Sequence, residues 1–229
     1  AFGVSVSVAV YARRWISLAR ARAVYGVAVD PQSRFVWAVS YAASGTVTAF
    51  QVDATTGALT PSGPAVATGS SFPYAVAVHP VSGEIYLAGG TSSTAFTTPV
   101  DAGAIQPSQT GSEDMFVARF SADLAARTGA TYLGTSGLDQ ARAMAFNAAG
   151  TEVLLAGLAA SAGFPGTASG APTVYGGGFD AILVRLSTDL TSINRTPQAM
   201  VYIPQSNVPP GTQRTSNEAR MVITPAPAT

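Results

Sequence analysis

Histidine, the residue most often used for proton transfer near neutral pH, occurs once in these 229 residues, as His79. A metal site built from two or three imidazoles is therefore excluded, and a Ser–His–Asp triad would have to use His79. Cysteine is absent, which excludes disulfides, thiolate catalysis and Cys-ligated zinc or iron–sulfur sites. His79 takes the place that Asp30 and Asn147 hold in similar segments of the chain, so we interpret it as a turn residue.

Two aspartates, Asp114 and Asp180, begin similar segments, Asp-Met-Phe-Val-Ala-Arg-Phe-Ser-Ala-Asp-Leu and Asp-Ala-Ile-Leu-Val-Arg-Leu-Ser-Thr-Asp-Leu. A carboxylate that recurs at the entrance of a strand can accept hydrogen bonds from turn N–H groups, which favours a structural role. Calcium binding is the alternative, although the acids are too scattered for an EF-hand-like cluster. Asp123 and Asp189, each followed by Leu, are interpreted as tight-turn residues. We expect no catalytic, cofactor-binding or metal-binding residue.

The charge of the chain argues against polyanionic partners. Only 10% of residues are charged, against about 25% in average proteins, and the net charge is zero. This balance provides no long-range attraction to phosphate, so we expect no nucleic-acid binding. The chain contains no run of about 18 apolar residues, so no membrane-spanning helix is predicted. The glycine runs 176–178 and 89–90 lack the lysine and the following helix of a phosphate loop.

A repeat organises the whole chain, because the similar segments recur together with their neighbours. Each copy predicts four short strands rich in Val, Ala, Phe and Tyr and bounded by Gly, Pro, Ser and Asn. The expected strands lie near 25–29, 34–39, 46–52 and 64–67, then 74–78, 84–89, 114–120 and 130–133, then 141–146, 152–157, 180–186 and 199–203. Further strands are expected within 3–12, 15–22 and 218–225.

The apolar runs within these strands favour a β-propeller over a sandwich. A lone four-stranded antiparallel sheet exposes both faces, whereas sheets stacked around an axis bury both. Runs such as Val153-Leu-Leu-Ala156 fit burial on two faces. We therefore predict an all-β fold, a β-propeller of four-stranded antiparallel blades, with about four blades or as a segment of a larger propeller. The single domain, 1–229, has blades at about 24–69, 74–135 and 141–206, with partial blade strands at 1–22 and 215–229.

Several motifs resemble the bacterial SBBP-type β-propeller repeat. They are Gly177-Gly-Phe-Asp-Ala-Ile-Leu-Val-Arg-Leu186, Ala130-Thr-Tyr-Leu-Gly134, Gly163-Phe-Pro165 and Ala88-Gly-Gly-Thr-Ser-Ser93, and the resemblance covers about 74–206. Thr97 departs from it, because Pro is usual there. The first blade resembles blades of lactonase-like seven-bladed propellers, in Gly45-Thr-Val-Thr-Ala-Phe-Gln-Val-Asp-Ala-Thr-Thr-Gly-Ala-Leu59 and in Ala67 to Val78. Both resemblances imply a propeller, and the SBBP repeat is nearly silent on function.

The repeat and the missing catalytic set favour a non-enzymatic extracytoplasmic scaffold or protein-interaction module of a bacterial surface or filament protein, secreted or on the cell surface. A protein partner or neighbouring subunit is expected at the long insertions 91–112 and 158–178, because long loops in a compact domain are usually functional or disordered. Two alternatives remain. One is a lactonase-like propeller hydrolase, suggested by 45–78. The other is a carbohydrate-binding propeller, whose candidate stacking residues are Trp15, Trp37, Tyr25, Tyr41 and Tyr86, although packing between blades is the commoner use of such residues.

Overall fold

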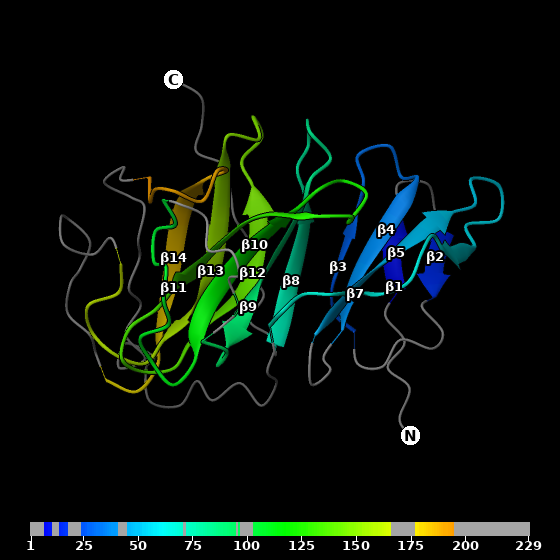
Figure 1. Cartoon of the computed structure of the whole chain (residues 1–229). Coiled ribbons are helices and arrows are strands. Elements are labelled where there is room, and N and C mark those ends of the chain that lie inside the picture. Colours follow the sequence, from blue (N-terminus) through cyan, green and yellow to red (C-terminus); the bar gives the residue numbers. More distant parts are fainter. Residues whose placement is uncertain are drawn as a thin grey trace, which may run out of the picture.

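The computed structural model of the chain describes residues 7–10, 14–17, 24–40, 45–70, 72–94, 96, 103–165 and 177–194. Within these ranges the chain forms strands and turns and no helix (Figure 1). The strands are β1 (Ser7–Val10), β2 (Arg14–Ser17), β3 (Val24–Val29), β4 (Phe35–Ser40), β5 (Thr46–Val52), β6 (Leu59–Pro61), β7 (Val66–Ala67), β8 (Phe72–Val78), β9 (Ile85–Thr91), β10 (Asp114–Phe120), β11 (Arg127–Leu133), β12 (Asp139–Phe146), β13 (Glu152–Ala159) and β14 (Asp180–Ser187).

The strands form successive antiparallel sheets of neighbouring chain segments. One sheet has the order β3-β4-β5-β6, with β7 also paired to β5. The next has the order β8-β9-β10-β11, and the third has β12-β13-β14. Strands β1 and β2 pair separately as a hairpin. This all-β, blade-by-blade organisation confirms the propeller-type fold predicted from the repeat.

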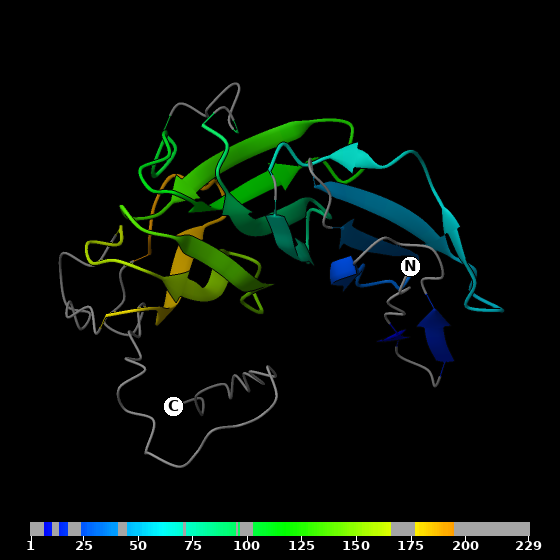
Figure 2. The same cartoon turned by 90° about the horizontal axis from the view of Figure 1, so that it is seen from below.

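The first strand of each sheet lies next to the first strand of the following sheet. Strand β8 contacts both β3 and β12, and the three sheets follow one another along an arc (Figure 2). Each of these inner strands is the edge of its own sheet among the described residues. The arc therefore presents a face built from β3, β8 and β12, here called the inner face.

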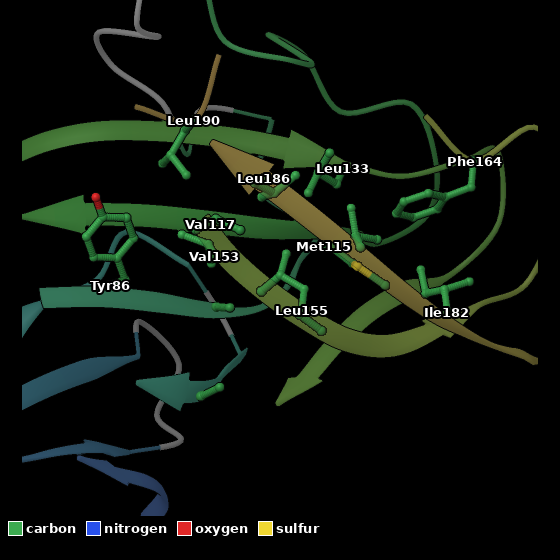
Figure 3. Packing of buried hydrophobic residues seen from close by; sticks show 14 of the residues in the cluster. Tyr86, Met115, Val117, Leu133, Val153, Leu155, Phe164, Ile182, Leu186 and Leu190 are labelled. Carbon is green, nitrogen blue, oxygen red and sulfur yellow. The ribbon is translucent and has the colours of Figure 1, made fainter. Parts of the chain in front are cut away.

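The middle sheet is buried on both sides, which accounts for its uninterrupted apolar strands. Ile85, Leu87 and Phe116 belong to the core shared with the first sheet, whereas Tyr86 and Met115 belong to the core shared with the third. Figure 3 shows the second of these cores, where side chains of β9, β10 and β11 meet those of β13 and β14. Because successive side chains of a strand point to opposite faces, each needs an apolar neighbour on its own side.

The equivalence of the two repeated aspartates is also confirmed. Asp114 begins β10 opposite Thr91 at the end of β9, and Asp180 begins β14 opposite Ala159 at the end of β13. Both are fully buried. The turns that follow match as well, since Leu124 has a φ of 59° and Leu190 a φ of 63°.

The fourth strand of the first sheet differs from expectation. It was expected near 64–67, but two short pieces, β6 and β7, pair with β5. Pro61 ends β6 and Pro64 lies in the break before β7, and proline has no N–H to donate to the ladder. The expected strands at 199–203 and 218–225 lie outside the described residues, and the blade boundaries remain a prediction.

Candidate functional site

The three inner strands share an irregularity at the same place. Pairing with the neighbouring strand skips one residue between Val24 and Gly26, between Pro73 and Ala75, and between Ala141 and Ala143. The skipped residues are Tyr25, Tyr74 and Arg142, here called the bulge row. A β-bulge leaves its extra residue out of the ladder and redirects its side chain, and bulges are common beside active sites.

The bulge row is continuous from sheet to sheet. The rings of Tyr25 and Tyr74 lie 5.5 Å apart at 75°, an edge-to-face arrangement. The guanidinium carbon of Arg142 lies 4.3 Å from the centroid of the Tyr74 ring. A cation over an aromatic face is attracted by the ring quadrupole, which holds Arg142 in place. Tyr25 and Arg142 are both exposed, so the row is a solvent-facing set of two phenol rings and one positive charge.

A second set of polar side chains lies directly beside the row. Arg142 Nη2 donates to Gln140 Oε1, and Gln140 Nε2 donates to Glu113 Oε1. Gln140 is buried, and both its side-chain oxygen and its side-chain nitrogen are hydrogen-bonded. Partial burial raises the pKa of Glu113, while the Gln140 hydrogen bond and the Arg142 charge lower it to a smaller extent. A half-buried carboxyl of raised pKa next to a cation is a candidate for proton transfer.

Glycine is required opposite this carboxylate. A Cβ added to Gly90 would lie 1.9 Å from Glu113 Oε1 and 3.1 Å from Gln140 Cγ. No side chain fits there without displacing the carboxylate. The Ala-Gly-Gly run at the end of β9, which contributed to the sequence resemblance, therefore leaves room for Glu113 and Gln140.

The buried aspartates behind the row act mainly as hydrogen-bond acceptors. Asp114 Oδ2 accepts from Thr110 N at 2.9 Å and from Gln106 Nε2 at 2.8 Å, and its Oδ1 accepts from Gly111 N at 3.0 Å. Asp114 thus has the structural environment predicted for it. Asp123 and Asp189 are likewise turn acceptors, for Ala125 N and Thr191 N.

Asp139, at the start of β12, was not predicted. Its Oδ2 accepts from Thr135 N and Oγ1, and the backbone N–H of Ala160 also contributes to the hydrogen bonding of the carboxylate. Burial, and to a lesser degree the nearby charge of Asp114, raise the pKa of Asp139 above its ordinary value. Within the described ranges no group of three or more His, Asp or Glu side chains could hold a metal ion.

His79 lies at the opposite end of β8 from the bulge row. Its Nδ1 accepts from Val81 N at 3.2 Å and from Ser82 N at 3.0 Å, and its Nε2 lies 2.7 Å from Gly150 O in the next sheet. Since Nδ1 is an acceptor, Nε2 carries the proton. These bonds match the predicted turn role, and the structure does not bring His79 to the bulge row.

Of the proposed stacking aromatics, only Tyr25 is part of the row. Trp37 and Tyr86 are buried between sheets. The side chains of Trp15 and Tyr41 lie outside the described residues. Sequence reasoning missed Tyr74, Arg142, Gln140 and Glu113. The available signal was the repeat itself, because Tyr25 and Tyr74 align when Val24-Tyr-Gly-Val is placed on Pro73-Tyr-Ala-Val.

The described parts of the two long insertions pack against the sheets. Phe96 is buried, and its ring lies 4.6 Å from that of Phe116, while its N–H donates to Tyr132 Oη. Phe164 is buried in the core between the second and third sheets (Figure 3). Gln106 joins the first insertion to β11 through its backbone N–H, which donates to Thr131 Oγ1. A partner at 91–112 or 158–178 stays a prediction.

No protein-family model and no curated protein matches the chain. It is similar to the gluconolactonase XC5397 of Xanthomonas campestris (TM-score 0.39, 17% identity, 62% of this chain and 37% of that one). It is also similar to the proposed 6-phosphogluconolactonase of Bacteroides uniformis ATCC 8492 (TM-score 0.44, 15% identity, 77% of this chain and 43% of that one). A third similar structure is the periplasmic gluconolactonase PpgL of Pseudomonas aeruginosa (TM-score 0.47, 12% identity, 79% of this chain and 44% of that one).

The chain spans less than half the length of each of these structures. At such low identity the likeness concerns the fold, and it bears neither for nor against an SBBP repeat. The expectation that the chain is not an enzyme is corrected, because all three similar structures are enzymes by name. That expectation was based on the scarcity of His and Cys, and it did not consider Arg142 and Glu113, which both bond Gln140. In the described residues no helix is long and apolar enough to cross a membrane.

Proposed function

We propose that the inner face binds a lactone of sugar type and that the propeller to which this chain contributes hydrolyses it. The observation that carries the proposal is the exposed guanidinium of Arg142, held by Tyr74 and Gln140, with the half-buried carboxyl of Glu113 on the other side of the same amide. The lactonase-like alternative is favoured over a scaffold because a scaffold has no need of such a cluster.

The chemistry of ester hydrolysis assigns a role to each group. The guanidinium of Arg142 donates to the lactone carbonyl oxygen and stabilises the negative charge that develops there. The carboxylate of Glu113 accepts a proton from the attacking water as the new C–O bond forms. The ring C–O bond then breaks, and the departing alkoxide takes up that proton from Glu113, which gives a hydroxy acid and restores the carboxylate. The raised pKa of Glu113 makes its carboxylate a stronger base than an ordinary glutamate.

The phenol of Tyr74, which also holds Arg142, binds the body of the substrate. A sugar ring has an apolar C–H face and a hydroxyl rim, and tyrosine offers an apolar ring with a polar end. We place the protein outside the cytoplasm, a location compatible with the periplasmic lactonase among the similar structures.

Hydrolysis of glucono-1,5-lactone by the full chain, followed in a pH-stat, tests the proposal. Arg142→Gln should lower kcat by roughly 100-fold to 1,000-fold, as loss of an oxyanion donor does. Because Glu113 acts as carboxylate, the wild-type rate should rise with pH as Glu113 ionises, and Glu113→Gln should abolish that rise.

The matched control is Arg119→Gln. Arg119 bonds Thr128 and Thr188 away from the bulge row, so its loss should leave kcat unchanged. Equal losses in the two arginine variants, or the absence of any lactone hydrolysis by the folded chain, would refute the proposal.

A further inference from the structure

The bulge row extends beyond the groups assigned to hydrolysis. Arg142 covers Tyr74 at 4.3 Å, and the ring of Phe72 stacks on Tyr74 at 6.5 Å with an angle of 10°. Tyr25, on the adjacent sheet, lies 5.5 Å from Tyr74 and is 52% exposed. An exposed ring is thus placed one sheet away from the proposed reacting centre.

The spacing between the two tyrosines is fixed by the backbone. A Cβ on Gly26 would lie 2.7 Å from Tyr74 O and 3.2 Å from Ala75 Cα, so β3 and β8 approach closely at this point. Both strands also bulge at their tyrosine, which gives the two side chains the same relation to their strands. The ring of Tyr25 therefore belongs to a rigid surface shared with Tyr74.

From this arrangement we infer a second subsite: the site takes a two-ring sugar lactone, whose lactone ring lies at Arg142 and Glu113 and whose attached sugar ring lies on Tyr25. This inference rests on the proposed function. An attached pyranose presents an apolar C–H face to the exposed ring of Tyr25, beyond the single ring held at Arg142.

Binding of two stable hydroxy acids to the full chain tests the subsite without turnover. Gluconate has one sugar unit, and maltobionate is the same acid with an attached glucose ring. In isothermal titration calorimetry the chain should bind maltobionate roughly threefold to tenfold more tightly than gluconate, the range of one aromatic contact.

Substitution at the subsite should remove this preference. Tyr25→Ala should bring the two dissociation constants together and leave that of gluconate unchanged, whereas Tyr25→Phe should keep most of the preference. Phe179→Ala is the matched control, since Phe179 is 46% exposed and is not a member of the bulge row. Equal binding of both acids by the wild type, no binding of either, or an unchanged preference in Tyr25→Ala would overturn the inference.

The two proposals fail separately. If the chain hydrolyses neither lactone but binds maltobionate through Tyr25, the hydrolase proposal is wrong and the two-ring subsite stands. If it hydrolyses glucono-1,5-lactone and maltobiono-1,5-lactone with equal kcat/KM, and Tyr25→Ala changes neither value, hydrolysis stands and the subsite is wrong.

Discussion

The two ends of the inner strands repeat from sheet to sheet in different ways. At the turn end, three chemically different residues each accept a hydrogen bond from a backbone N–H of the turn. Asp30 Oδ1 accepts from Phe35 N, His79 Nδ1 accepts from Ser82 N, and Asn147 Oδ1 accepts from Thr151 N. Their backbone N–H groups also donate to equivalent carbonyl oxygens, those of Phe35, Glu84 and Glu152. An acceptor is needed there, and its chemical identity is secondary.

At the bulged end the backbone repeats but the side chains do not replace one another. Tyr25, Tyr74 and Arg142 occupy equivalent bulges, and they contact one another instead of closing their own turns. Interchangeable acceptors thus mark a structural position, whereas the different side chains joined across sheets form the surface to which we assign ligand binding. The comparison predicts that stability and function separate between the two ends.

The largest expected effect on stability is at the turn end. His79→Ala removes the acceptor for two N–H groups and the contact of Nε2 with Gly150 O between sheets. The free energy of unfolding should fall by about 1–3 kcal/mol, because the buried Gly150 carbonyl loses its donor, whereas the exposed Val81 and Ser82 N–H groups can bond water instead. Urea denaturation measures this change.

Function is the control for His79→Ala. Gluconate binding and lactone hydrolysis by the folded variant should equal those of the wild type, because His79 lies at the far end of β8. Loss of activity without loss of stability would reverse the assignment of the two ends.

A smaller effect is expected from Asp139→Asn, just behind the bulged end. Because the folded-state pKa of Asp139 is raised, the folded protein holds its proton more tightly than the unfolded chain. The wild type is therefore most stable below the unfolded pKa and loses stability as the pH rises through the folded pKa. The variant lacks this loss, so its stability relative to the wild type should increase from pH 4 to pH 7 in parallel urea titrations. A constant difference between the two proteins would contradict the burial of an ionising Asp139.

The smallest effect is expected from Asp30→Asn. The amide oxygen can still accept from Phe35 N, and only the ion pair with Arg34 is lost. Arg34 is 66% exposed, and exposed pairs contribute about 0–1 kcal/mol. Thermal melts should show a loss within this range. A loss as large as that of His79→Ala would show that charge, and not only an acceptor, is required at this turn.

Much of the fold was predictable because it depends on local patterns. Strand β10 coincides with its expected range because Asp114 and Asp180 mark the repeat and the apolar runs between turns give the strand. The split of the fourth strand into β6 and β7 was missed, since a repeat aligned on its best strands says little about its weakest one.

The candidate site was not predicted because its parts are distant in sequence. Glu113, Gln140 and Arg142 meet only when β10 and β12, from different sheets, lie side by side. A bulge shifts the in/out alternation of a strand by one residue, but between Ala141 and Ala143 this shift leaves no visible change in the apolar pattern, so nothing at Arg142 indicated that its side chain leaves the ladder. The count of His and Cys was correct, but it was the wrong basis for judging catalysis.

Both faces of the middle sheet are apolar and buried. Strand β9 is buried along its whole length, and β10 is buried at all positions but Arg119. If either neighbouring sheet is lost, by truncation or by incomplete synthesis, a continuous apolar face is left open. We expect such a fragment to self-associate through this face instead of remaining a smaller functional unit, because the neighbouring sheets are what keep the apolar surface of the middle sheet covered.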